Sequence, residues 1–333
     1  MVKLGTVFYT GDITMDEIIT MAKRCEELGY DAFTPAENSG KDSFAVLAAV
    51  APLTRALTLG TSIVNVYSRT PTLLAMAFNG LNVWTGGRVR IGLGTGGEGF
   101  MVRGHGIPIE RPLARVRETV VIMRKLLTGE RVSHDGEFFK ITKFYLRERP
   151  LKEPMPIYLS ALGPKMTQLA GEVADGIVVN FLNHRHVATI KENLAIGAKR
   201  AGRDPDAVKI STLSMTCPEL GEPEAVKTTK KKVAFYCATE HYHFIAKSEG
   251  FLDKAQKVKG LWDQNKHEAA LQEVTDEMVN TFTLGLSKDH MRDKLKGYMK
   301  AGIEPLIYPQ ERHGMCFQDH LSCLELAAEC AKG

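Results

Sequence analysis

The sequence predicts an α/β protein folded as a (β/α)8 barrel. Short runs of β-branched and apolar residues alternate with longer helical runs along the whole chain. Eight such short runs can be counted, and repeated strand–helix units form parallel sheets. The 333 residues suit a barrel, which typically takes about 250 residues, plus an insertion.

The first half of the chain supplies four strands with their helices. Gly29 stands where the first helix should stop, because glycine readily ends a helix in a left-handed conformation. Asp135 and Gly136 lie between two alternating runs and predict a hairpin. The expected strands are 4–9, 32–35, 57–64 and 88–93, the helices are 15–28, 43–53, 71–84 and 112–127, and the hairpin is 132–144.

The second half continues the alternation, with one long interruption. The expected strands are 156–159, 176–180, 208–214 and 305–308; the helices are 164–173, one ending near 200, 288–301 and 316–332. The helical region 222–284 is too long for one crossover between the last two strands. We therefore expect a single domain, 1–333, with a helical insertion at 215–285 that serves as a substrate cap or a dimer contact.

A doubly wound dinucleotide-binding fold is the rival prediction. Gly92, Gly94 and Gly97 satisfy the spacing G-x-G-x-x-G. The motif follows the fourth strand instead of the first, and no helix is expected within it because further glycines and Pro108 delay the next helix. A single match of this kind is weak evidence for a dinucleotide site.

Composition restricts the partners. The net charge of +4 is mild, and the basic run 230–232 lacks interleaved aromatic residues, so we expect no nucleic-acid partner. No apolar run approaches the roughly 20 residues of a membrane helix, and the N-terminus resembles a strand and a turn more than a signal peptide. The six cysteines contain no CxxC pair, which favours a cytoplasmic protein without a metal site.

Four polar loops at the expected ends of strands are candidates for chemistry, because barrels place their active sites there. The loops are 35–38 (PAEN), 61–65 (TSIVN), 94–99 (GTGGEG) and 160–166 (SALGPKM). Glu37 could bond a cofactor hydroxyl or cap the next helix. Pro164 suits the first turn of a helix, where free amides and Lys165 could hold an anion. Such loops favour a flat cofactor that performs its own chemistry.

These segments also carry a family resemblance. The strings LGTSIVNVYSRTP, GRVRIGLGTG, RVRETVVIMRKLLTGE and PIYLSALGPKMTQLAGEVADGIVVN resemble the bacterial-luciferase-like flavin and deazaflavin oxidoreductases. Within them the chain is most similar to the coenzyme F420-dependent branch that includes methylenetetrahydromethanopterin reductase. The resemblance runs from about residue 4 to 180 and resumes over about 275–304.

The resemblance implies a TIM barrel in which a deazaflavin exchanges a hydride at its carbon 5. It implies a non-prolyl cis peptide at Ser62–Ile63 behind the deazaflavin ring. The residues it implies for the ring site and for the coenzyme tail are Glu37, Asn65, Thr95, Gly96, Glu98, Asn180, Ala161, Gly163, Pro164, Lys165 and Met166.

Two departures from the family pattern affect the function. The F420 branch has Asp-His after the second strand, where this chain has Glu37 and Asn38, which leaves FMN as an alternative cofactor. The methanopterin reductase has a carboxylate in its first strand at the position of Val7. The remaining candidates for the proton are Glu98, His241 and His243, although two histidines two residues apart are more often surface residues.

The sequence therefore predicts a cytoplasmic F420-dependent oxidoreductase that moves a hydride between the deazaflavin and a small organic substrate. The alternatives are an FMN-dependent luciferase-like monooxygenase and a non-catalytic flavin-binding barrel. The resemblance also implies a homodimer, since relatives pair through barrel helices. An apolar face over 72–83, which includes Leu73, Leu74, Ala77 and Leu81, permits such pairing and serves equally for packing against the barrel.

Overall fold

The computed structural model describes residues 3–217, 219–310 and 316–332. Its main sheet is a closed parallel barrel, in which β3 pairs with both β2 and β5. The strands are β1 (Gly5–Phe8), β2 (Ala32–Pro35), β3 (Thr58–Gly60), β4 (Val64–Asn65), β5 (Val89–Gly94), β8 (Ile157–Ser160), β9 (Gly176–Asn180), β10 (Lys209–Thr216) and β11 (Ile303–Pro309). Because β3 and β4 both pair with β5, they are two parts of one strand position, and the predicted eight-stranded barrel is confirmed.

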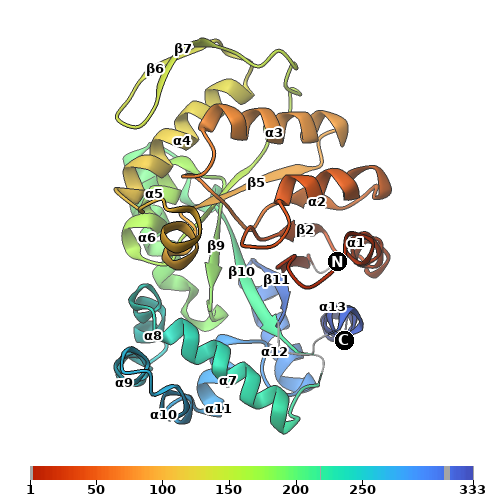
Figure 1. Cartoon of the computed structure of the whole chain (residues 1–333), viewed down its shortest axis with the longest axis vertical. Helices are drawn as coiled ribbons and strands as arrows, with labels where there is room; N and C mark the ends of the chain where they lie inside the picture. The colour runs from red at the N-terminus through yellow and green to blue at the C-terminus, as the bar shows by residue number, and fades with distance from the viewer. Residues whose placement is uncertain (1–2, 218, 311–315, 333) are drawn as a thin grey trace.

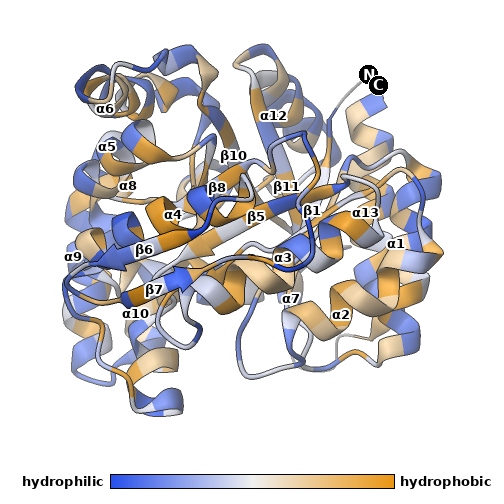
Figure 2. Ribbon diagram, turned by 90° about the horizontal axis from the view of Figure 1, so that it is seen from above, coloured by the Kyte–Doolittle hydropathy of each residue, from blue (hydrophilic) through white to orange (hydrophobic). Residues whose placement is uncertain are grey.

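Helices surround the strands on all sides (Figure 2). They are α1 (Met15–Leu28), α2 (Ser43–Val50), α3 (Pro71–Trp84), α4 (Pro112–Leu127), α5 (Pro164–Val173), α6 (Val187–Arg200), α12 (Lys288–Lys300) and α13 (Phe317–Lys332). Local signals define their ends. Thr14 and Glu17 form a capping box at the start of α1, and Gly29 ends it with φ of 84°.

Five helices form the insertion between β10 and α12. They are α7 (Pro223–Cys237), α8 (His243–Ser248), α9 (Leu252–Asp263), α10 (His267–Gln272) and α11 (Asp276–Phe282). Figure 1 shows them gathered at one end of the molecule, with the hairpin of β6 (Val132–Asp135) and β7 (Lys140–Phe144) at the other. The hairpin was predicted and is confirmed by antiparallel pairing.

Three local features differ from the expectations. The expected strand 57–64 is interrupted between Gly60 and Val64. The α-helix beginning at Ser43 ends at Val50 and continues as a short 3-10 turn, because Pro52 has no N–H to donate. No helix begins within the glycine motif, as predicted, but the expected delay of the next helix is wrong, since a π-helical segment, Gly99–Gly104, begins two residues after Gly97.

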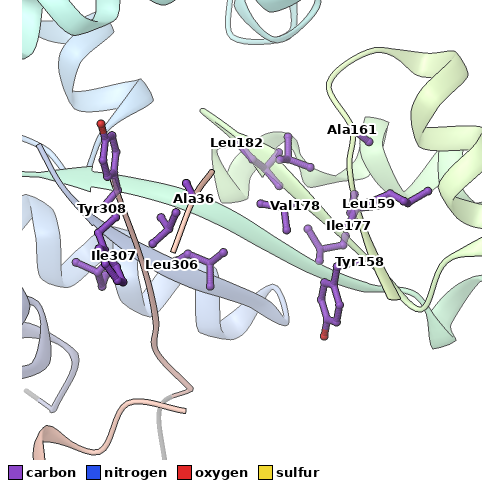
Figure 3. Close-up of a cluster of buried hydrophobic side chains, with 14 of the residues drawn as sticks. Ala36, Tyr158, Leu159, Ala161, Ile177, Val178, Leu182, Leu306, Ile307 and Tyr308 are labelled. Carbon is purple, nitrogen blue, oxygen red and sulfur yellow. The ribbon is translucent and has the colours of Figure 1, made fainter. Parts of the chain in front are cut away.

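An ion pair spans the barrel interior near the amino ends of the strands. The Arg90 guanidinium on β5 donates to both carboxylate oxygens of Glu304 on β11, at 3.0 and 2.7 Å, although the two strands lie on opposite sides of the barrel. The Arg90 guanidinium also lies 5.1 Å from the centre of the Tyr158 ring. Side chains alternate along a strand, so Gly94 and Tyr308 also face inward, nearer the carboxyl ends. Figure 3 shows the Tyr158 and Tyr308 rings pointing in opposite directions.

Candidate active site at the carboxyl end of the barrel

One half of the barrel mouth, formed by β2, β4, β5 and β8, carries small side chains, and we call it the small-residue half. Ala36 and Ala161 lie there, both buried. A Cβ built on Gly94 would come within 2.9 Å of the Ile63 side chain and 3.1 Å of the Ser160 Cβ. Ile63 therefore lies directly over Gly94 and beside Ser160.

The segment after β3 is fixed by two backbone hydrogen bonds to the carboxyl end of β2 and the loop that follows it. The Ser62–Ile63 peptide bond is cis, as the family resemblance implies. The Ser62 amide donates to the Pro35 carbonyl at 3.1 Å, and the Glu37 amide donates to the Ile63 carbonyl at 3.2 Å. The Ser62 hydroxyl is buried and has no hydrogen-bond partner within the described part of the chain. A ligand could supply that partner.

Glu37 and Asn65 are linked to each other beside this segment. The Asn65 amide donates to the Glu37 carboxylate at 3.2 Å, and Arg69 contacts the other Glu37 oxygen at 2.5 Å. Arg69 also pairs with Asp42, which caps α2 through the amides of its first turn. The alternative that Glu37 caps the next helix is therefore wrong, because Asp42 does so.

The glycine-rich loop after β5 forms the adjoining wall. Gly96 has φ of 73°, and a Cβ there would lie 3.4 Å from the Asn65 Cβ. Thr95 is half-buried, and its hydroxyl donates to the Gly96 carbonyl at 3.2 Å. Glu98 begins the π-helical segment with an exposed side chain. The structure thus brings Thr95 and Gly96 beside Asn65, while Glu98 lies on the outer part of the loop.

The loop after β8 leads into the start of α5. Gly163 is the N-cap of this helix, and no side chain caps it. Lys165 is exposed and Met166 half-buried in the first turn. Because the first amides of a helix have no partner within it, this turn can hold an anion, and Lys165 adds positive charge. Pro164 occupies the first position, as predicted.

The other half of the mouth is rich in tyrosine, and its members Tyr9, Tyr236, Tyr242 and Tyr308 are called the tyrosine group below. Tyr9 follows β1 and Tyr308 lies on β11, with ring centres 5.7 Å apart. Tyr236 on α7 and Tyr242 before α8 have ring centres 4.9 Å apart. The Asn180 amide on β9 donates to the Tyr242 hydroxyl at 3.1 Å. The insertion is thus joined to the barrel at this point.

The hydroxyls of the tyrosine group influence one another. Burial is the main cause that raises the pKa of Tyr236 well above its usual value, and the neighbouring Tyr9, Tyr242 and Tyr308 add to it. Burial also raises the pKa of Tyr242, which the Asn180 bond partly offsets. Tyr236 and Tyr242 are therefore neutral phenols at ordinary pH.

The two predicted histidines lie on either side of Tyr242. His241 is exposed. The His243 ring nitrogen Nε2 is 2.9 Å from the Cys237 carbonyl, a contact within the insertion. The structure thus joins Asn180, a predicted site residue, to Tyr242, which was not predicted as one. The inward alternation on β1 and β11 could have indicated Tyr9 and Tyr308, but no local signal indicates Tyr236 or Tyr242.

Within residues 3–217, 219–310 and 316–332, no group of three or more histidine, cysteine, aspartate or glutamate side chains is arranged to hold a metal ion. No helix in the described ranges is long and apolar enough to cross a membrane.

Comparisons with known proteins agree with this architecture. A 5,10-methylenetetrahydromethanopterin reductase of Archaeoglobus fulgidus is 30% identical over 315 residues, which cover 92% of each chain. A solved coenzyme F420-dependent tetrahydromethanopterin reductase from Methanopyrus kandleri has a TM-score of 0.82 at 24% identity, covering 98% of this chain and 97% of that one. A solved F420-dependent secondary alcohol dehydrogenase, in complex with an F420–acetone adduct, has a TM-score of 0.75 at 18% identity, covering 99% and 100%.

At these identities the two structures establish the shared fold. The family itself follows from the sequence. Residues 3–304 match the model of a family described as luciferase-like monooxygenase. This match and the 30% identical relative confirm the resemblance read from the motifs, and the chain belongs to the luciferase-like family.

Proposed function

We propose that this protein is a coenzyme F420-dependent oxidoreductase that transfers a hydride between the deazaflavin and a small organic substrate. The observation that carries the proposal is the division of the barrel mouth. The small-residue half, where Ile63 lies over Gly94, offers a flat surface for a tricyclic ring. The named activities of the reductase and dehydrogenase relatives support a deazaflavin as the ring.

The residues of the small-residue half fit this coenzyme. Ile63 would lie against the ring, and the buried Ser62 hydroxyl is available to a polar edge. The uncapped start of α5 and the exposed Lys165 would hold the anionic tail of the coenzyme. The other residues of this assignment are Glu37, Asn65, Thr95, Gly96, Glu98, Ala161, Gly163, Pro164, Met166 and Asn180.

When bound, the coenzyme supplies or accepts the hydride. The protein's own contribution is position and exclusion of water. The insertion contributes Tyr236 and Tyr242 to the mouth, so a substrate between them and the ring surface would be screened from solvent. The substrate would occupy the side of the mouth formed by the tyrosine group.

Direct titration of the purified protein with F420 and with FMN, followed by fluorescence quenching, tests the proposal. We expect F420 to bind and FMN to bind at least tenfold more weakly. Gly94→Val should abolish binding, because any Cβ at Gly94 already crowds Ile63 and Ser160. Gly97→Val is the matched control, since nothing lies within 4 Å of a Cβ there.

Tight FMN binding without F420 binding would overturn the proposal in favour of the FMN-dependent monooxygenase. Binding of F420 without turnover over a broad panel of carbonyl and imine substrates would favour the non-catalytic barrel. Equal loss of binding in the Gly94 and Gly97 variants would place the ring somewhere other than the small-residue half.

We also propose that the protein is a homodimer that pairs through α3. Its exposed apolar side chains are Leu73, Met76 and Trp84, which lie on one helix face. The apolar face expected from the sequence is only partly correct, because Leu74 and Leu81 are buried. Sedimentation of the wild type and of Met76→Glu tests the pairing, with a dimer expected for the first and a monomer for the second; a monomeric wild type would contradict it.

The cysteines support the finer proposal of a cytoplasmic location. All six cysteines of the chain are described, and none of them forms a disulfide bond. Cysteines without disulfide bonds are typical of a reducing compartment. Fractionation of cells that produce the protein would test the location.

A further inference from the structure

The tyrosine group contains a hydrogen bond between two phenols. Tyr236 and Tyr9 are hydrogen-bonded through their side chains, in the sense that raises the pKa of Tyr236. Either phenol can donate or accept in such a bond, so a Tyr9 oxygen that has lost its proton can accept from the Tyr236 hydroxyl. Tyr236 is buried, whereas Tyr9 is half-buried and faces the mouth of the barrel.

A lysine accompanies this pair on the insertion. Lys232 and Tyr236 are four residues apart on α7 and so lie on the same face of the helix. The Lys232 ammonium is 6.0 Å from the centre of the Tyr9 ring and 5.9 Å from that of Tyr308. The Lys232 charge thus acts on both rings, and it favours a negative charge on either phenol. Tyr9 also has the hydrogen bond to Tyr236, so its anion would have both a positive charge and a hydrogen-bond donor beside it.

The hydroxyls of Tyr242 and Tyr236 are less suited to release a proton. The Tyr242 hydroxyl accepts the Asn180 hydrogen bond, and burial raises its pKa. Burial is also the main reason that the pKa of Tyr236 is raised, so that phenol retains its proton and can donate to Tyr9. His243 is held at the Cys237 carbonyl, inside the insertion.

We propose that Tyr9 is the proton donor of the reaction when the substrate carries a carbon–oxygen or carbon–nitrogen double bond. This inference rests on the proposed function, which supplies the hydride. As the substrate carbon accepts the hydride and its electron pair, the π electrons of the double bond move to the oxygen or nitrogen. That atom takes the Tyr9 proton, and the electron pair of the broken O–H bond stays on the Tyr9 oxygen.

The resulting phenolate is stabilised by the Tyr236 hydrogen bond and the Lys232 charge, and it regains a proton from solvent. The substrate has gained two electrons and two hydrogens, and the deazaflavin has lost two electrons as hydride. The reverse reaction, oxidation of an alcohol or amine, uses Tyr9 as the base.

Binding of an oxyanion tests the assignment without turnover. The probe is 4-nitrophenol, whose anion is coloured, titrated into the protein with and without F420. A Tyr9 hydroxyl that donates to a developing oxyanion should bind the anion in preference to the neutral phenol. We expect Tyr9→Phe to weaken binding of the anion by about 10- to 100-fold, the loss of one hydrogen bond to a charged group. Tyr145→Phe, an exposed tyrosine beside the hairpin, should leave it unchanged.

Tyr236→Phe provides a second variant, because it removes the donor to Tyr9 and keeps the ring. We expect it to weaken binding of the anion by about three- to tenfold. Failure of the wild type to bind the anion, or less than threefold weakening in both variants, would overturn the inference. A parallel F420 fluorescence titration separates the two proposals. If F420 binds but Tyr9→Phe does not weaken binding of the 4-nitrophenol anion, only this inference fails. If F420 does not bind, the proposed function itself is wrong.

Discussion

The side-chain amide of Asn180, on β9, donates a hydrogen bond to the hydroxyl of Tyr242, 3.1 Å away in the insertion. The two residues are 62 positions apart in the sequence. The tilted contact of Tyr242 with Phe181, at 5.7 Å between ring centres, adds to this connection. The insertion is thus attached to the strand end where the substrate is proposed to bind.

A double-mutant cycle measures this attachment. We expect Asn180→Ala and Tyr242→Phe each to lower the free energy of unfolding by about 1 kcal/mol, since each removes one buried hydrogen bond. The loss of unfolding free energy in the double variant should be smaller than the sum of the losses in the two single variants, by a coupling energy of about 0.5–1.5 kcal/mol. Hydrogen exchange should increase in α7 and α8 before it increases in the barrel strands. Additive effects would show that the bond contributes nothing to stability.

The ion pair inside the barrel predicts an asymmetric response to mutation. Arg90→Met should lower the free energy of unfolding by about 3–5 kcal/mol, because Glu304 is left without its charge partner in the interior. Arg90→Met combined with Glu304→Leu should recover much of that loss, because no buried charge remains. Urea denaturation of the three proteins tests this, and a double variant as unstable as Arg90→Met would contradict it.

Lys294 predicts a pH dependence above neutrality. Its ammonium donates to the carbonyls of Asn280, Thr281 and Thr283 at the end of α11, and burial lowers its pKa to about 7. Between that value and the unfolded value of about 10.4, the unfolded chain binds more protons, so stability rises with pH at up to about 1.36 kcal/mol per unit.

Lys294→Met should remove this slope. It should also lower stability by about 1–3 kcal/mol, because the three carbonyls lose a donor. Thermal unfolding of both proteins between pH 7 and 9 checks the slope. Equal slopes for the variant and the wild type would show that Lys294 does not titrate in this range.

Glu118 predicts a pH dependence in acid. Burial tends to raise the pKa of this carboxylate, but the amides of Phe138 and Phe139 and the ring of His134 lower it below the usual value. The stabilisation is present above the unfolded pKa and is lost as pH falls through the folded pKa. Glu118→Gln should abolish this loss of stability in acid. It should also weaken the attachment of the hairpin at neutral pH. Amide exchange at residues 132–144 between pH 3 and 7 measures both effects.

Much of the fold could be predicted because its signals are local. Pro71, Pro112 and Pro164 each occupy the first turn of a helix, and the bounds of these helices agree with those expected from the sequence. The interruption between β3 and β4 could not be predicted from local preference. It depends on the hydrogen bonds that Ser62 and Ile63 make to Pro35 and Glu37, at the end of the neighbouring strand β2.

The site was predictable only where one loop carries several of its residues. The loops at 61–65, 94–99 and 160–166 were found because small and polar residues follow a strand directly. Tyr236 and Tyr242 belong to helices with no such pattern, and they join the site only because the insertion folds back onto the strand ends. His241 and His243 were predicted as site residues because of their residue type. In the structure it is Tyr242, between them, that bonds to the barrel.

The two halves of the barrel mouth come from different stretches of the chain. The small-residue half is built from residues between 35 and 163, whereas three of the four members of the tyrosine group come from residues 236–308. Natural variation, or a mutant library, confined to the insertion can therefore change what is reduced without disturbing the redox cofactor.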